Sequence, residues 1–177
     1  YIYTSESLAT LKGKKLHSKR NFINRFLQQY EGRWRYEVLD PAKHQEEIMK
    51  FHHLWCERHG EPKADTTVYE HCAVWQALEH YEALGMRGGV LYVDGAMAAF
   101  TMGSPSSCDT LTVQIEKALA DLPGCYPMIN REFIAHSGMD CTYVNREEDM
   151  GIEGLRKAKL SYYPVELTVK YRMEPLA

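Results

Sequence analysis

Apolar residues recur at helical intervals in two segments of the first half of the chain. One segment is Lys14–Tyr30 and the other runs from Asp40 to about His59. The second opens with aspartate and proline, a pair typical of a helix start because the aspartate caps free N–H groups and the proline fits the first turn. Between them, residues 33–39 alternate apolar and charged positions, as in a strand with one buried face. We therefore expect helix, strand and helix here, after an extended start and a short helix from Thr4 or Ser5.

The second half of the chain carries most of the predicted strands. Two apolar runs, Gly88–Val93 and Ala96–Met102, are joined by Asp94-Gly95, which favours a two-residue hairpin turn. A helix precedes this hairpin, because Thr67–Glu70 fits a capping box and Gly85 fits a helix end. The later expected elements are a strand at Thr110–Ile115, a helix at Pro127–Ser137, a strand at Cys141–Val144 and a last strand at Val165–Tyr171. This order predicts an α/β (α+β) protein.

Composition narrows the classes of function. The chain has 177 residues, of which 45% are hydrophobic and 25% charged, and this is ordinary for a globular domain. No run reaches the roughly 18 apolar residues that a membrane span needs, and no segment resembles a signal peptide. The net charge of −3 gives no general attraction to nucleic acid, so any such binding requires a local basic patch. Five scattered cysteines without a CxxC pair indicate reduced thiols and a cytoplasmic protein.

The sequence gives little or no support for a serine nucleophile, a nucleotide-binding loop or a zinc site. The chain has no GxSxG elbow, P-loop or GxGxxG motif. His52, Cys56 and His59 share one helix face, and His71 or Cys72 would supply a fourth zinc ligand. However, this spacing is not a recognised finger pattern and the face adjoins Trp55. We therefore expect a packed helix and predict no metal.

A basic block lies in the first predicted helix region. Its members are Lys12, Lys14, Lys15, His17, Lys19, Arg20 and Arg25, with no acid between Glu6 and Glu31. In a chain of net negative charge, this block is the clearest local excess of one sign of charge. It suits phosphate binding through charge-assisted contacts, whereas the alternative is a solvated helix face.

The segment Asn145–Leu160 combines acids, glycines and bases. Glu147, Glu148 and Asp149 precede Gly151, and Arg156, Lys157 and Lys159 follow within a predicted helix. A strand that ends in carboxylates before a glycine turn and a basic helix suits binding of a polar substrate at a sheet edge. A solvated helix with ion pairs is the alternative. Glu116 and Lys117 follow the third strand of this half, where a carboxylate would serve as a general base, and an ion-paired strand end is the alternative.

The sequence resembles the phosphatidylglycerol lysyltransferase C-terminal domain family across nearly the whole chain. The segments that carry the resemblance are Leu11–Asn21, Gly88–Leu91 with Asp94-Gly95, Ile115–Ala118, Ile129-Asn130 and, most specifically, Asn145–Tyr162. The resemblance implies a GNAT (acyl-CoA N-acyltransferase)-like fold, with a mixed, largely antiparallel sheet flanked by helices. It also implies tandem modules, so that residues 1–40 are a basic linker helix and strand, the tail of a missing first module, and residues 41–177 are the GNAT-like module.

The resemblance implies an acyl- or aminoacyl-transferase that moves an activated acyl group to an amine or hydroxyl acceptor. The expected catalytic residues are Glu116, Glu148 and Asp149. The expected substrate-binding residues are Lys117, Asn130, Asn145, Arg146, Arg156, Lys157, Lys159 and Tyr162. The expected donor- or phosphate-binding residues are Lys14, Lys15, His17, Lys19 and Arg20. The partners expected are small-molecule or transfer-RNA-linked substrates, and a membrane is not among them because the membrane-embedded part of the lipid enzymes is absent.

The donor is expected to be acyl-CoA or aminoacyl-tRNA. Acetyl-CoA enzymes of this fold have a glycine-rich pyrophosphate loop, whereas Asp121–Pro127 holds one glycine and two prolines. Prolines lack the N–H groups that would hold a diphosphate, which weighs against acetyl-CoA. Two alternatives stay open: a non-catalytic module that binds RNA or another polyanion, and an acetyl-CoA-dependent N-acetyltransferase.

Overall fold

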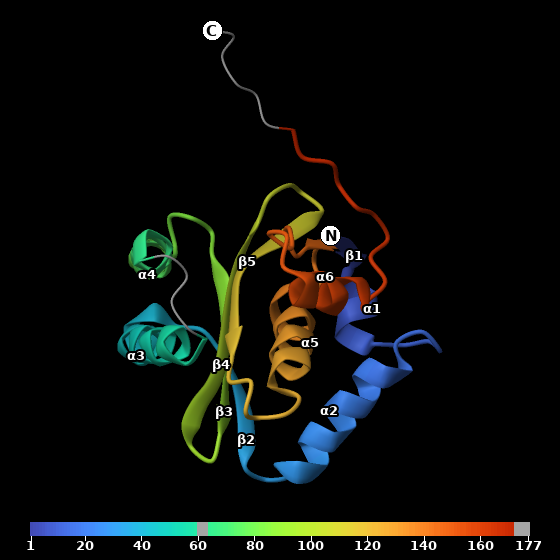
Figure 1. Cartoon of the computed structure of the whole chain (residues 1–177), viewed down its shortest axis with the longest axis horizontal. Coiled ribbons are helices and arrows are strands. Elements are labelled where there is room, and N and C mark those ends of the chain that lie inside the picture. The colour runs from blue at the N-terminus through green and yellow to red at the C-terminus, as the bar shows by residue number, and fades with distance from the viewer. Residues whose placement is uncertain (60–63, 172–177) are drawn as a thin grey trace, which may run out of the picture.

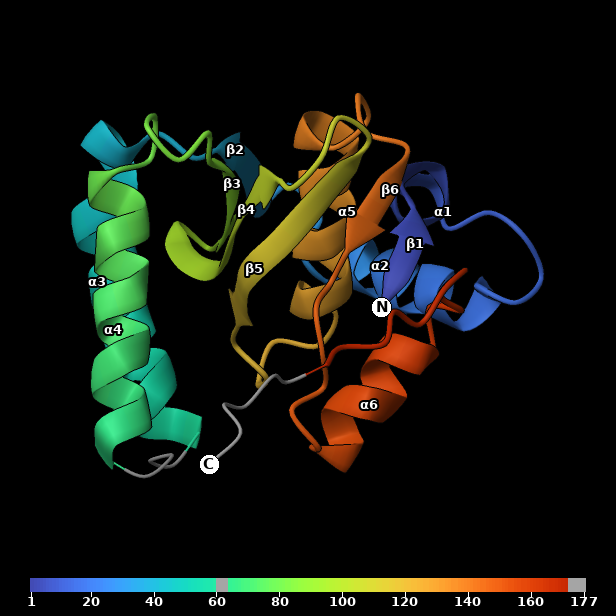
Figure 2. The same ribbon diagram turned by 90° about the horizontal axis from the view of Figure 1, so that it is seen from above.

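A six-stranded sheet lies between two layers of helices (Figures 1 and 2). The computed structural model of the chain describes residues 1–59 and 64–171, with side chains for residues 1–58 and 70–171. The elements are β1 (Ile2–Thr4), α1 (Ser5–Thr10), α2 (His17–Gln29), β2 (Trp34–Val38), α3 (Pro41–His59), α4 (Ala64–Glu79), β3 (Arg87–Val93), β4 (Ala96–Pro105), β5 (Thr110–Ala118), α5 (Cys125–Ser137), β6 (Tyr143–Asn145) and α6 (Glu153–Leu160). No helix within the described ranges is long and apolar enough to cross a membrane.

The strand order is β1-β6-β5-β4-β3-β2. Neighbouring strands are antiparallel except for β5 and β6, which are parallel. The β5–β6 pairing joins Thr110–Thr112 to Tyr143–Asn145 and then stops, although β5 continues to Ala118. Figure 2 shows β5 and the chain after β6 separating beyond this point. The C-terminal half of β5 therefore has a strand neighbour on one side only.

Each face of the sheet has its own hydrophobic core. α1, α2 and α5 cover one face, where Phe26, Leu111 and Phe133 are fully buried. α3 and α4 cover the other face, where Ile48 and Phe100 are fully buried. Burial of side chains of this size supplies about 1.5–3 kcal/mol each, which fixes both helical layers to the sheet.

A bulge in β5 exchanges the faces that its side chains cover. Gly103 of β4 pairs with Val113 and Met102 pairs with Ile115, so Gln114 is an extra residue on β5. A Cβ on Gly103 would lie 2.4 Å from the carbonyl oxygen of Thr112, so only glycine permits this close approach. Before the bulge Val113 packs in the α5-side core, whereas after it Ile115 packs in the α3–α4 core.

Most of the predicted elements are confirmed. Thr4 caps α1, where its side chain accepts a hydrogen bond from the Ser7 N–H, and the Asp40 side chain accepts one from Ala42 at the start of α3. The Asp94-Gly95 hairpin turn has positive φ angles at both residues, 53° and 80°, as the sequence predicts.

Several predicted boundaries are wrong, among them the helix end expected at Gly85, since α4 ends at Glu79. α2 begins at His17 and not at Lys14, because the preceding turn includes Gly13 with a φ of 96°. α4 begins at Ala64, before the expected capping box at Thr67. β5 continues to Ala118, so Glu116 and Lys117 lie within the strand and not after it. The last predicted strand is reduced to one bridge, between Ile2 and Glu166, because β1 offers only three residues for pairing.

Candidate functional site

A buried ion pair lies where β5 and β6 separate. Glu116 comes from β5 and Arg146 directly follows β6, and an Arg146 Nη atom lies 2.7 Å from Glu116 Oε1. Asn130 of α5 donates from Nδ2 to the other carboxylate oxygen, at 2.9 Å. The Glu116 and Arg146 side chains are 11% and 13% exposed, and Asn130 is 1% exposed. The Glu116 carboxylate of β5 is thus surrounded by side chains from α5 and the segment after β6.

The β5 bulge directs Glu116 into this cluster. Side chains alternate along a strand, so the extra residue Gln114 turns Glu116 to the α5 face and Lys117 to the α3–α4 face. Lys117 accordingly contacts Glu70 of α4, with Nζ 2.5 Å from Oε1, and lies 3.6 Å from the Trp55 ring centroid. The structure therefore does not bring Lys117 to Glu116, although the sequence predicts both at one substrate site.

Two polar atoms of the cluster have no hydrogen-bond partner among the described residues. They are Nη1 of Arg146, a donor, and Oδ1 of Asn130, an acceptor, and both are buried. A buried polar atom without a partner costs about 1–3 kcal/mol. Because Nη2 of Arg146 and Nδ2 of Asn130 both bind Glu116, the unpartnered donor and acceptor flank one carboxylate. A bound molecule that accepts from Arg146 and donates to Asn130 would satisfy both.

Aromatic rings support the guanidinium of Arg146. Its Cζ lies 5.1 Å from the ring centroid of Tyr162 and 6.0 Å from that of Tyr3. Lys19 of α2 lies against the same Tyr162 ring, at 4.3 Å. Burial raises the pKa of Tyr162 to about 12 and lowers the pKa of Lys19. Tyr162 and Lys19, both predicted site residues, therefore join the Glu116 cluster.

The acids and bases between β6 and α6 mostly bind one another. Asp149 accepts hydrogen bonds from Arg156 at 2.7 Å, from the Tyr1 hydroxyl at 2.5 Å and from the Gly151 N–H at 2.9 Å. The Arg156 guanidinium and the other two donors hold the pKa of Asp149 well below its usual range. Lys159 donates to the backbone carbonyl groups of Arg146 and Glu148. These contacts fix the loop that positions Arg146.

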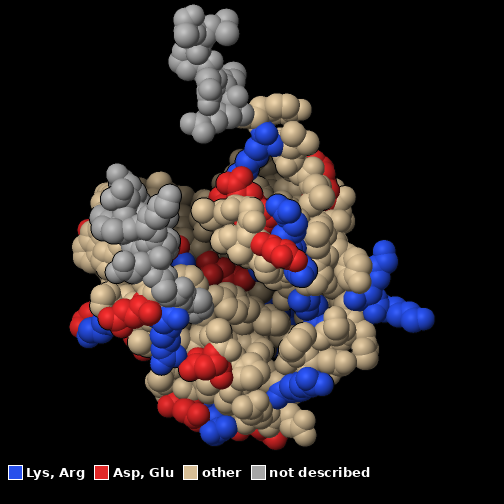
Figure 3. Space-filling view, in the orientation of Figure 1, with Lys and Arg blue, Asp and Glu red and all other residues tan. Residues whose placement is uncertain are grey.

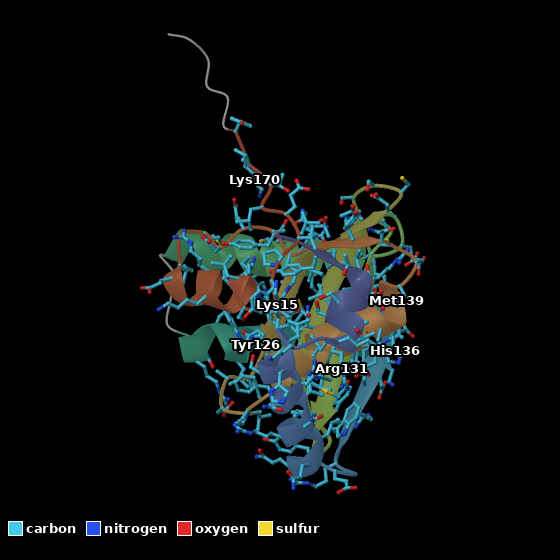
Figure 4. All side chains as sticks on the ribbon, turned by 90° about the vertical axis from the view of Figure 1, so that its right-hand side faces the viewer. Lys15, Tyr126, Arg131, His136, Met139 and Lys170 are labelled. Carbon is cyan, nitrogen blue, oxygen red and sulfur yellow. The ribbon has the colours of Figure 1, made fainter. Side chains whose placement is uncertain are left out.

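The other predicted residues of this segment lie at the surface. Glu148 is exposed and lies 3.3 Å from Lys170, and Lys157 pairs with Glu153 at 2.6 Å. Asn145 accepts a hydrogen bond from the Glu147 N–H. A pocket of about 300 Å³ opens here, lined by Tyr1, Asn145, Glu147, Glu148, Leu167, Thr168 and Lys170. Figure 4 shows Lys170 on the C-terminal segment, apart from Tyr126 at the start of α5.

The predicted phosphate-binding residues divide into two groups. Lys14, Lys15 and His17 are exposed around the turn between α1 and α2, where basic side chains project from the surface (Figure 3). Lys15, labelled in Figure 4, lies 5.5 Å from the Tyr163 ring centroid. Arg20 instead donates to the carbonyl groups of Leu11 and Gly13, so it holds the turn.

Two contact residues were not expected from the sequence, Tyr3 at the Glu116 cluster and Glu70 on the opposite sheet face. Tyr3 donates to the Lys159 carbonyl at 2.8 Å and faces Arg146, and Glu70 binds Lys117. No sequence signal identifies Tyr3, since it lies in a short extended start. Of the three zinc ligands considered from the sequence, His52, Cys56 and His59, the last lies outside the residues with described side chains. Figure 3 shows a hollow between α6 and the α3–α4 layer, with acidic atoms at its bottom.

Residues 1–174 match the protein family described as phosphatidylglycerol lysyltransferase, C-terminal. A conserved protein of unknown function from Bacteroides thetaiotaomicron is 44% identical, with a TM-score of 0.88 over 94% of this chain and 56% of that one. The C-terminal domain of a candidate lysylphosphatidylglycerol synthetase from Agrobacterium fabrum is 16% identical, with a TM-score of 0.64 over 92% of this chain and 55% of that one. The chain thus spans just over half the length of these two proteins.

The fold is also that of N-acetyltransferases. A ribosomal-protein-alanine N-acetyltransferase from Brucella melitensis has a TM-score of 0.52 over 81% of this chain and 99% of that one, at 10% identity. At this identity the likeness concerns the fold alone. It confirms the expected GNAT-like architecture, in which a mixed, mostly antiparallel sheet is flanked by helices.

Proposed function

Because this chain belongs to the family of phosphatidylglycerol lysyltransferase C-terminal domains, we propose that it is an acyltransferase acting at the Glu116–Arg146–Asn130 cluster. It moves an activated acyl group, in our proposal the aminoacyl group of a charged transfer RNA, to an amine or hydroxyl acceptor. One observation carries this proposal: a buried donor and a buried acceptor, neither with a partner among the described residues, flank the Glu116 carboxylate. These are the groups that acyl transfer needs.

The reaction assigns a role to each side chain. An amine acceptor donates one N–H to Asn130 Oδ1, and Glu116 takes a second amine proton as the nitrogen attacks the carbonyl carbon; a hydroxyl acceptor has a single proton, which it gives to Glu116. Arg146 Nη1 donates to the carbonyl oxygen, where negative charge develops. The new bond joins the nucleophile to the carbonyl carbon, and the ester C–O bond breaks. Glu116 then returns the proton to the leaving hydroxyl of the transfer RNA.

Glu116 is a better base in this scheme than the two other predicted acids. Asp149 is held ionised by Arg156, Tyr1 and Gly151, and its lowered pKa makes it a poor proton acceptor. Glu148 is exposed and its carboxylate faces Lys170. Glu116 alone among the three lies beside the two unpartnered atoms.

Transfer RNA is preferred to acyl-CoA as the donor for two reasons. The connection between β5 and α5 contains Pro123, and Pro127 lies in the first turn of α5, so few N–H groups are available for a diphosphate. Lys14, Lys15 and His17 form an exposed basic surface that suits the phosphates of a polynucleotide. Charged transfer RNA also agrees with the expected cytoplasmic location.

The test is a transfer assay with labelled aminoacyl-tRNAs and a panel of amine and hydroxyl acceptors. Replacement of a general base lowers such rates by about 10²–10⁴-fold, so Glu116→Gln should lose this much with transfer-RNA affinity unchanged. Glu132→Gln is the matched control, because Glu132 is a similarly buried carboxylate that pairs with Arg131. Full activity of Glu116→Gln would contradict the proposal.

A second candidate function is a module that binds RNA without catalysis. The exposed basic turn between α1 and α2 favours it, because that surface needs no contribution from Glu116. Salt-sensitive transfer-RNA binding with no transfer to any acceptor would support this module. Acetyl-CoA as an alternative donor in the same assay identifies an ordinary N-acetyltransferase.

A further inference from the structure

A cluster of potential metal ligands lies on the sheet face opposite Glu116. His52 and Cys56 stand one turn apart on α3, and Glu70 belongs to α4. One ligand atom from each of the three residues lies within 4.8 Å of the other two. His52 is fully buried, and Cys56 and Glu70 are partly buried. The two consecutive helices α3 and α4 therefore bring nitrogen, sulfur and oxygen donors together.

The buried imidazole of His52 lacks a strong hydrogen-bond partner among the described residues. The contacts of its ring nitrogens are to the Cys56 sulfur, at 3.8 and 3.9 Å. A thiol is a weak donor and a weak acceptor, so it satisfies the imidazole poorly. The ring also stacks on His71, with centroids 5.7 Å apart, which adds no hydrogen bond. A metal ion would supply the partner that the imidazole lacks.

We propose that His52, Cys56 and Glu70 bind a transition-metal ion of the zinc class, which joins α3 to α4. Imidazole nitrogen, thiolate sulfur and carboxylate oxygen are the ligands that zinc takes, usually four in a tetrahedron. Three protein ligands leave a fourth position for water. Cys56 binds as the thiolate, so one proton leaves for each ion bound. This site is separate from the proposed acyl-transfer cluster, since it faces the other helical layer.

Lys117 pairs with the Glu70 carboxylate and limits the affinity of the site for a cation. Its Nζ binds Glu70 Oε1 at 2.5 Å, which leaves the second carboxylate oxygen for the metal. Its positive charge repels a divalent cation at the same time. Removing that charge with Lys117→Met should therefore strengthen zinc binding, an effect that a purely structural lysine would not show.

The test measures zinc binding to tag-free protein by calorimetry, with cobalt as a spectroscopic substitute. Wild-type protein should bind about one zinc per chain and melt at a higher temperature with zinc. Cobalt should give the charge-transfer absorption of a metal–thiolate bond. Cys56→Ser and Glu70→Gln should each weaken zinc binding at least about tenfold. Circular dichroism establishes that each variant is folded.

Matched controls separate the site from incidental surface ligands. Cys72→Ser removes an exposed thiol on α4, and His53→Ala removes the neighbouring exposed imidazole, which pairs with Glu57. Both controls should bind zinc as wild type does. Absence of zinc binding by wild type would overturn the proposal. Undiminished binding by folded Cys56→Ser or by folded Glu70→Gln would overturn it as well.

Discussion

At the scale of single residues, the Glu116–Arg146 pair is the most constrained feature of the site. Both side chains are nearly buried and are held 2.7 Å apart by elements that otherwise separate. Burying charge is costly unless each charge has a partner. The pair therefore couples the function of the site to the stability of the fold.

Arg146→Met should lower the free energy of unfolding by about 3–5 kcal/mol, because it leaves the Glu116 carboxylate buried without its partner. The double variant Arg146→Met/Glu116→Gln should lose less than the sum of the two single changes. Urea unfolding of the four proteins measures this coupling. Additive losses would show that the two side chains do not interact.

Asp149 supplies a pH-dependent part of the stability. Its pKa in the folded protein lies below its ordinary value of 3.8, mainly because of Arg156. The stabilisation is therefore complete above that ordinary value and is lost as the pH falls through the folded pKa. Asp149→Asn should be less stable than wild type at pH 7, and the difference should shrink in acid. Glu153→Gln, an exposed change on α6, should leave the stability curve unchanged.

Residue identities indicated part of the site. Glu116, Asn130 and Arg146 are predicted site residues, and the structure joins them in one cluster. The sequence predicts Lys117 at the same substrate site as Glu116, because adjacent residues at a strand end are expected to face one ligand. The bulge at Gln114 decides which face each side chain covers, and it depends on the register between β4 and β5, which one strand's pattern does not contain.

At the scale of elements, the turn between α1 and α2 presents the exposed basic residues. Arg20 holds the turn through two backbone carbonyl groups, so Lys14 and Lys15 stay free for contacts with solvent or ligand. The basic block of the sequence thus contains two kinds of residue in the structure: exposed lysines at the surface, and Arg20, which stabilises the turn. The structural role of Arg20 depends on the path of the turn, which the sequence does not specify.

Lys14→Glu/Lys15→Glu should weaken transfer-RNA binding and leave the melting temperature unchanged, because both side chains are exposed. Each phosphate contact removed should reduce the salt dependence of binding by about one unit of slope. Filter binding at several salt concentrations measures this. Lys43→Glu/Lys50→Glu, an exposed double change on α3 with the same change in net charge, is the matched control. Equal losses in both variants would show that only net charge matters.

Helix and strand signals located most elements, because amphipathic periods and caps act locally. The strand boundaries that are predicted wrongly depend on pairing with strands distant in sequence. β5 extends past Ile115 because β4 pairs with it as far as Ala118. The C-terminal segment forms only one bridge because β1 is short.

At the scale of the whole molecule, the two helical layers give the sheet two chemically different faces. The α5 face carries the Glu116 cluster, and the α3–α4 face carries Lys117, Glu70 and the proposed metal ligands. The chain is about half as long as the relatives from Bacteroides thetaiotaomicron and Agrobacterium fabrum. Because this chain matches only part of each relative, the proposed activity has to be measured with this chain and not with the longer proteins.

The most direct test of the acyl-transfer site is a crystal structure with an amide-linked mimic of the aminoacyl end of transfer RNA. We predict that the mimic's carbonyl oxygen lies about 3 Å from Arg146 Nη1 and that its reacting carbon faces Glu116. Arg146 Nη1 and Asn130 Oδ1, the two unpartnered atoms of the cluster, would then both be within reach of the reactants. A mimic bound with its carbonyl group away from Arg146 would contradict the account.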